Sequence, residues 1–252
     1  LKDLTRIAEG YNLLSVVTNS LGEKEKSIDY SKKALALFEQ TNDIDGVLYV
    51  KYNMALDLAE TKKEMKASFD LLYEVDSIAA VHKFWSHSIS AKTGIIFNAI
   101  DIGDYKKAIT TLGELELMTE KIKTSIDNYM LYDLYSVFGE SYIALEDYDK
   151  AINVLKKGIS VSKKNNKYWF ILANYLQIAE IFLIKKDTLA AIEVFKKASS
   201  LKNKVKNSPN GLRLNKLSLG YYHYYSGIYV AAKQHLIEVI KDAESFNSTL
   251  EV

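Results

Sequence analysis

The stretch that decides the fold is residues 139–152, GESYIALEDYDKAI. A small residue (Gly139) and an aromatic residue (Tyr142) precede a polar turn, and a second small residue (Ala151) follows the turn. From Ala151 onward, apolar residues recur at i, i+1, i+4 and i+8, which is the spacing of one apolar stripe on a helix. The stretch therefore predicts two helices joined by a short turn.

The turn and the small residue after it recur along the whole chain. Residues 103–109, GDYKKAI, are a close copy, and looser or degenerate copies begin at Gly22, Lys63, Lys186 and Gly227. We call the small residue after each turn the anchor; the anchors are Ser27, Ser68, Ala108, Ala151, Ala191 and Ala232. They are 41, 40, 43, 40 and 41 residues apart, and this near-constant spacing predicts an array of helix pairs.

A second apolar stripe precedes each turn, and it carries a small residue in most copies. The residue twelve positions before the anchor is Ser15, Leu56, Ile96, Gly139, Ala179 or Gly220. A small residue there lets two antiparallel helices approach closely, and neither helix can bury its stripe until the next pair stacks on it. We expect an all-α fold of about six antiparallel helix pairs forming one array over 1–252. The expected pairs cover residues 4–40, 44–80, 84–124, 126–165, 167–205 and 211–247.

This order of small residue, aromatic residue, acidic turn and alanine resembles the signature of the tetratricopeptide repeat (TPR) family. The best copy is Gly139, Tyr142, Tyr148 and Ala151, and the first three repeats lack the aromatic residue. The resemblance implies a right-handed superhelical solenoid that binds other polypeptides and is not an enzyme. The period is longer than the usual ~34 residues, which adds about one turn to each helix.

Long-period arrays of this type resemble the TPR regions of bacterial regulators and sensors. These include receptors for peptide pheromones and the input halves of membrane-bound signalling enzymes, such as histidine kinases or diguanylate cyclases. The chain starts at Leu1 without a methionine, so we expect a fragment of a longer protein whose output domain lies outside it.

The composition agrees with a helical array and indicates no catalytic or metal-binding site. There are 11 glycines and one proline, far fewer turn residues than an all-β chain needs. The net charge of +1 gives no reason to expect a nucleic-acid partner. The chain has no cysteine, which excludes thiolate zinc sites and is compatible with both the cytoplasm and the periplasm. His82 and His87 are five residues apart, which is not the spacing of a helical metal pair. No nucleotide or hydrolase motif occurs, so neither metal nor cofactor is expected.

One apolar segment raises the question of a membrane span. Residues 168–184, YWFILANYLQIAEIFLI, contain a single charged residue. Asn174, Gln177 and Glu180 would each be costly in lipid, and the segment follows the repeat spacing. We therefore expect a buried repeat helix here.

The resemblance also predicts a ligand site, because TPR ligands lie against the first helix of each pair. It places the inward-facing positions 18, 15, 11 and 8 residues before each anchor. Of these 24 positions six are acidic and none is Lys or Arg. The candidate groove residues are Asn12, Asn53, Asp57, Glu60, Phe97, Asp133, Glu140 and Glu180, and the candidate apolar anchor pocket is Leu176, Leu183, Leu214, Leu217, Tyr221 and Tyr224. A slip of one residue in helix register would dissolve this pattern.

An acidic groove favours a basic or polar extended peptide over an acidic C-terminal tail. The Asn12 and Asn53 amides can pair with N–H and C=O groups of a peptide backbone. The apolar end can take an apolar side chain, or be covered by a further helix or by a second copy of the chain. Three hypotheses follow: a peptide-binding sensory or docking module, a structural array that forms a homodimer, and a nonclassical enzyme or small-ligand binder.

Overall fold

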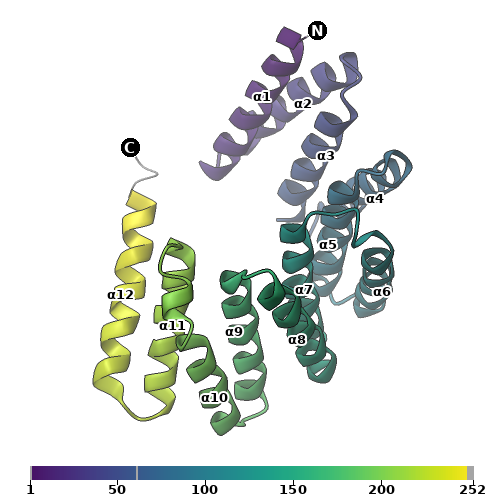
Figure 1. Ribbon diagram of the computed structural model, residues 1–252. Coiled ribbons are helices and arrows are strands. Elements are labelled where there is room, and N and C mark those ends of the chain that lie inside the picture. Colours follow the sequence, from purple (N-terminus) through teal and green to yellow (C-terminus); the bar gives the residue numbers. More distant parts are fainter. Residues whose placement is uncertain (1, 61, 249–252) are drawn as a thin grey trace. The chain divides into compact units, whose positions relative to one another are not determined.

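The computed structural model describes residues 2–60 and 62–248, and in those residues twelve helices pack in successive pairs (Figure 1). The all-α prediction is confirmed. The chain divides into two compact units, residues 1–127 and 128–252, which we call the N-terminal and C-terminal units. The N-terminal unit holds α1 (Lys2–Ser20), α2 (Lys24–Gln40), α3 (Ile44–Ala59), α4 (Met65–His82), α5 (Trp85–Asp101) and α6 (Tyr105–Ile122).

The C-terminal unit repeats this plan with one irregularity. It holds α7 (Asn128–Ala144), α8 (Tyr148–Lys164), α9 (Tyr168–Ile184), α10 (Thr188–Ser199), the 3-10 helix η1 (Lys202–Lys204), α11 (Pro209–Tyr225) and α12 (Tyr229–Ser248). α10 is the shortest of these α-helices, with 12 residues, and a long connection that includes η1 follows it. The helix pairs match the six predicted repeats closely, whereas their union in one array over 1–252 stays a prediction.

The repeated turn is a helix stop followed at once by a helix start. In five of the six pairs the middle residue of this three-residue turn has a positive φ of 58 to 79°; these residues are Gly22, Gly103, Glu146, Lys186 and Gly227. After α7, Asp147 N donates to Tyr142 O at 2.9 Å and Glu146 N donates to Ile143 O at 3.0 Å, which satisfies carbonyls at the helix end. The Asp147 side chain then accepts from Lys150 N at 3.3 Å and caps α8.

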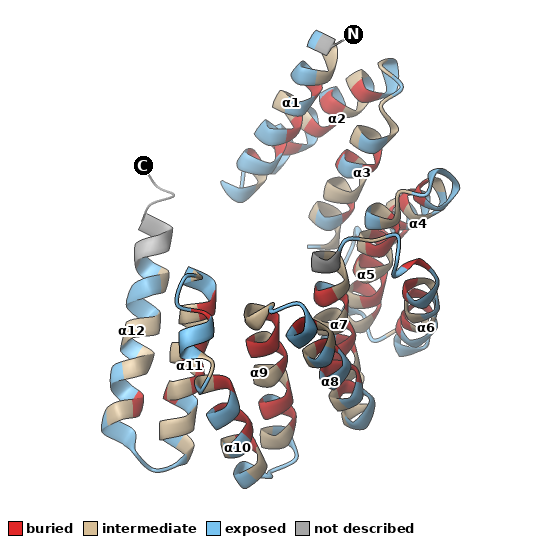
Figure 2. Ribbon diagram, viewed as in Figure 1, coloured by how far each residue is buried: buried red, intermediate tan, exposed pale blue. Residues whose placement is uncertain are grey.

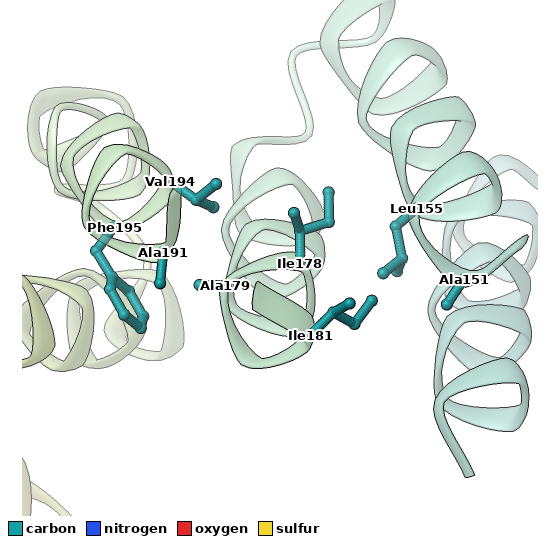
Figure 3. Packing of buried hydrophobic residues seen from close by; sticks show 8 residues of the cluster. All are labelled: Ala151, Leu155, Ile178, Ala179, Ile181, Ala191, Val194 and Phe195. Atoms are coloured by element: carbon teal, nitrogen blue, oxygen red, sulfur yellow. The ribbon is translucent and has the colours of Figure 1, made fainter. Parts of the chain in front are cut away.

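Small residues bring the paired helices together, as the sequence predicts. Ser15 on α1 shares a hydrogen bond of 3.2 Å with the anchor Ser27 on α2. On α7, a Cβ added to Gly139 would lie 2.4 Å from Cδ2 of Leu155 on α8, so a larger residue would require the Leu155 side chain to move. Figure 3 shows the continuation of this core, in which side chains of α8, α9 and α10 converge; the cluster is Ala151, Leu155, Ile178, Ala179, Ile181, Ala191, Val194 and Phe195.

The second pair departs from the predicted register by one residue. Ala55 is fully buried and its carbonyl accepts from the hydroxyl of the anchor Ser68 at 2.6 Å, whereas Leu56, the residue predicted there, is 41% exposed. The cause is the connection between α3 and α4, which spans 60–64 and is longer than the three-residue turns of the other pairs. Val50, which the sequence placed in the groove, is consequently fully buried.

The apolar segment 168–184 is α9, which is largely buried along its length (Figure 2). Its buried residues are Phe170, Ile171, Leu172, Asn174, Ile178, Ala179 and Ile181. None of the helices formed by the described residues is long and apolar enough to cross a membrane.

Candidate functional site

In the N-terminal unit, the first helices α1 and α3 are linked by polar side chains that the sequence had assigned to the groove. Asn53 Nδ2 faces Asn12 Oδ1 at 3.5 Å, and Asn19 Nδ2 donates to Asp57 Oδ1 at 2.8 Å. Asn12 is buried, with 7% of its surface exposed. These amides therefore hold the two helices together, and their predicted contact with a peptide backbone stays a prediction.

A small pocket lies beside these residues. It has a volume of about 110 Å³ and is lined by Asn19, Lys24, Ile28, Ser31, Met54, Asp57, Leu58 and Glu64. Burial, with a contribution from the neighbouring Glu60, raises the pKa of the Asp57 carboxyl. The Glu60 carboxylate pairs with Lys24 Nζ at 2.6 Å, and this hydrogen bond lowers the pKa of Glu60. Phe97, the remaining candidate in this unit, is half-buried on α5.

In the C-terminal unit, α7 and α9 are linked in the same way. Ser136 Oγ donates to Asn174 Oδ1 at 2.8 Å, and Gln177 Nε2 donates to Glu140 Oε1 at 2.9 Å. Burial raises the pKa of Glu140; the Gln177 bond opposes this shift and the charge of Glu180 adds to it. Glu140, Glu180 and Asp133 are nevertheless exposed, so their carboxylates reach solvent on neighbouring first helices.

Three lysines of the first helices pair with acidic residues of the second helices. Lys92 on α5 contacts Asp76 on α4 and Glu114 on α6, each at 2.9 Å. Lys51 on α3 pairs with Glu74 on α4. On α11, Lys216 contacts Asp242 at 2.8 Å and Glu238 at 3.7 Å, both on α12. These three lysines therefore join first helices to second helices.

The six residues of the predicted apolar pocket are divided between two packing clusters and an exposed edge. Leu176 and Leu183 pack on the cluster of Figure 3, whereas Leu214 packs against Leu172, Ala198 and Val205. Leu217 is half-buried. Tyr221 and Tyr224 are exposed, with their rings 5.2 Å from Phe195 and 5.9 Å from Tyr229, respectively. Their role as a ligand pocket stays a prediction.

A larger pocket escaped the sequence reasoning altogether. Its volume is about 450 Å³, and it lies between the α8–α9 turn and the α10–α11 connection. It is lined by Asn166, Lys167, Tyr168, Trp169, Phe170, Lys204, Val205, Ser208 and Asn210. The signal that could have found it is the lack of acidic residues: there is none from 150 to 179 or from 194 to 237.

Paired helices joined by one repeated turn, with polar links between first helices of successive pairs in each unit, are typical of an α-solenoid scaffold. Comparison with known proteins supports a particular family. A sequence model of the tetratricopeptide repeat family matches residues 132–165 and 172–205, which correspond to the α7–α8 and α9–α10 pairs. These residues therefore resemble tetratricopeptide repeats, a family that generally provides non-catalytic scaffolds for protein–protein interaction, and the structural neighbours below share the fold.

One curated relative and several solved structures are similar to this chain. The BBSome complex member BBS4 of Bos taurus is 28% identical over 135 residues, which are 54% of this chain and 22% of that protein, so the chain spans about a fifth of this relative.

Among solved structures, a putative kinesin light chain of Podosopora anserina with nearly identical TPR-like repeats has a TM-score of 0.58 at 14% identity, covering 80% of this chain and 96% of that one. A signal transduction ATPase (STAND) protein of Pyrococcus horikoshii with a tetratricopeptide repeat sensor has a TM-score of 0.60 at 15% identity, with coverages of 98% and 38%. A Rap protein complexed with Competence and Sporulation Factor has a TM-score of 0.55 at 15% identity, with coverages of 96% and 70%. At these identities the likeness shows the fold alone.

Proposed function

We propose that this chain is the sensory or docking module of a bacterial signalling or regulatory protein and that it binds an extended basic or polar peptide. The observation that supports this most directly is the exposed acidic row on α7 and α9, formed by Asp133, Glu140 and Glu180. A peptide lying across these helices meets carboxylates, because α7 and α9 carry no Lys or Arg. The likeness to a TPR sensor and to a Rap protein supports the same use of the fold.

The proposed mechanism follows from the way repeats contact each other. Each helix pair packs on its neighbours, so small rotations at successive interfaces add up along an array. A peptide that contacts several first helices favours one set of these rotations, and an attached output domain senses the shift in population. The inter-helix bonds Gln177–Glu140 and Ser136–Asn174 lie where such a rotation acts.

Peptide binding, measured by fluorescence anisotropy, tests this proposal. A labelled Lys/Gly/Ala peptide is compared with a Glu/Gly/Ala peptide of equal length. The double change Glu140→Gln and Glu180→Gln should weaken binding of the basic peptide about tenfold, because it removes two exposed charges from the contact surface.

The matched control removes the same two charges elsewhere in the C-terminal unit, through Glu193→Gln on α10 and Glu244→Gln on α12. We expect a change of about twofold or less from this control. Equal losses from both double variants, or tighter binding of the acidic peptide, would sink the proposal.

One observation favours a second function, self-association. α12 exposes large apolar residues, including Val230 at 85%, Ile240 at 56% and Ile237 at 40%. Exposed apolar surface of this kind is typical of an interaction site. Sedimentation over a concentration series tests this: a dimer that Val230→Lys converts to a monomer supports it, and a monomer at all concentrations rejects it.

A further inference from the structure

The charges of the two units differ in sign. Residues 1–127 contain 16 basic and 20 acidic residues, whereas residues 128–252 contain 17 basic and 12 acidic residues. The excess in the C-terminal unit comes from two stretches without any Asp or Glu, 150–179 and 194–237, which together hold 14 Lys and Arg. A chain that is nearly neutral as a whole therefore has one strongly basic part.

The two acid-free stretches meet at the larger pocket of the C-terminal unit, which we call the basic pocket. The first supplies 166–170 at the α8–α9 turn, and the second supplies 204–210 from the α10–α11 connection. The pocket lies at the turns between helix pairs, so its lining is separate from the acidic row on α7 and α9. Its volume of about 450 Å³ is within the range of ligand-binding sites.

The lining combines an apolar floor with a cationic rim. Phe170 and Val205 are buried, with 5% and 3% of their surfaces exposed. Lys204 is exposed, and its Nζ lies 5.4 Å from the centre of the Tyr168 ring. Arg213 Nη2 donates to Asn210 Oδ1 at 3.1 Å, which brings a guanidinium to the same edge. A ligand that fits this lining carries a negative charge next to an apolar group.

We propose that the basic pocket binds an acidic segment of a partner protein in which a carboxylate adjoins an aromatic or aliphatic side chain. The carboxylate pairs with Lys204, and the apolar side chain lies against Trp169 and Val205. This site goes beyond the peptide site on the first helices and takes the opposite charge, so either site can be lost while the other is kept.

The geometry favours a peptide over a single-stranded nucleic acid. Nucleic-acid sites of that kind offer aromatic ring faces on which successive bases stack. Here Lys204 covers the Tyr168 ring, and Trp169 packs edge-to-face on Phe170 with ring centres 4.6 Å apart. A side chain of a peptide can instead enter the space beside these rings.

Trp169 provides the readout. The chain has two tryptophans, Trp85 and Trp169, so in a Trp85→Phe background the pocket residue is the single fluorophore. This protein is titrated with three short synthetic peptides: one with Glu beside Phe, one with Glu beside Ser, and one with Lys beside Phe. The proposal requires a saturable change in Trp169 emission with the Glu–Phe peptide and at least about fivefold weaker binding of the other two.

Two charge-reversal variants distinguish binding at the pocket from nonspecific electrostatic attraction to the protein. Lys204→Glu should weaken binding of the Glu–Phe peptide about tenfold, because it places like charges together. Lys202→Glu is the control, because it changes the net charge by the same amount. Lys202 is exposed on the same 3-10 helix and does not line the pocket. We expect about a twofold effect from it. Circular dichroism confirms that both variants are folded.

Several results would overturn the proposal. Equal losses from Lys204→Glu and Lys202→Glu mean that net charge, and not the pocket, attracts the peptide. Equal binding of the Glu–Phe and Glu–Ser peptides means that the apolar floor contributes nothing. An oligothymidylate that binds more tightly than the Glu–Phe peptide, and loses affinity with Lys204→Glu, assigns the pocket to nucleic acid instead. No change in Trp169 emission with any peptide rejects the site.

Discussion

The Gln177 amide on α9 donates a 2.9 Å hydrogen bond to the carboxylate of Glu140 on α7, two residues that lie 37 positions apart in the sequence. The bond joins the first helices of two successive pairs. It also supports a carboxylate whose pKa is raised mainly by burial. Ionised Glu140 thus costs the fold some stability while it presents a charge on the surface that we propose to bind peptides.

This cost predicts a pH-dependent effect of removing the charge. Folding raises the pKa of Glu140 above its ordinary value of 4.5, so the folded state disfavours the ionised form. The penalty is absent below pH 4.5 and develops as pH rises through the folded-state pKa. Glu140→Gln should therefore stabilise the protein at pH 7 by less than about 1 kcal/mol, given the exposure of the side chain.

Urea unfolding at pH 7 and pH 4 measures this gain, which should vanish at the lower pH. Glu193→Gln, on the exposed face of α10, removes the same charge away from the α7–α9 contact and serves as the control. A Glu140→Gln variant that is less stable than the wild type at pH 7 contradicts the assignment.

The close approach of α7 and α8 predicts opposite effects for the same substitution at two glycines. Gly139→Ala places a Cβ 2.4 Å from Cδ2 of Leu155, a fully buried side chain. We expect a loss of about 1–3 kcal/mol in the free energy of unfolding. Gly113→Ala on α6 meets nothing within 4 Å and should stabilise by about 0.5–1 kcal/mol. Thermal denaturation of both variants decides the point, and an equal response at the two sites would contradict it.

The positive φ of non-glycine residues in the turns predicts a stabilising substitution. Glu146 has a φ of 58°, a conformation that costs a residue with a Cβ about 1 kcal/mol relative to glycine. Glu146→Gly should raise the free energy of unfolding by about 0.5–1 kcal/mol. Glu146→Ala removes the same side chain without freeing the backbone, so it should give no such gain. If the two variants are equally stable, backbone conformation is not the cause.

A buried hydrogen-bond chain in the N-terminal unit predicts coupling between two residues. Asn98 Nδ2 on α5 donates to Ser68 Oγ on α4 at 2.9 Å, and Ser68 Oγ donates to Ala55 O on α3 at 2.6 Å. Asn98→Ala should cost about 1–3 kcal/mol, because it leaves buried groups without their partners. In a double-mutant cycle with Ser68→Ala, a coupling of at least about 0.5 kcal/mol is expected. Strict additivity in urea unfolding would show that the two side chains act independently.

Most of the fold could be predicted from the sequence because its determinants are local. The turn at Gly103 or Glu146 stops one helix and starts the next with residues adjacent in the chain, so one repeated motif locates both helix ends. The small residue at Gly139 follows from the same spacing. The second repeat was misaligned by one residue, because the connection between α3 and α4 is longer than the three-residue turns of the other pairs.

The candidate site was less predictable because it depends on which residue of a neighbouring helix faces each side chain. Asn12 and Asn53 were predicted to contact a peptide backbone, which stays a prediction, but the sequence did not show that Asn53 Nδ2 lies 3.5 Å from Asn12 Oδ1. The basic pocket was missed for a related reason. Its two parts, 166–170 and 204–210, come from different helix pairs, and neither part alone contains a recognisable motif.

The nine residues between α10 and α11 have a consequence for protein engineering. The other connections between successive helix pairs are shorter, so a change in their length would shift the helices that they join. In the α10–α11 connection, insertions at the exposed residues Lys206 and Asn207 can be absorbed at the surface while Val205 keeps its place against Leu172 and Ala198. A foreign loop inserted between Lys206 and Asn207 should therefore leave the helix pairs intact, because it keeps Val205 in place.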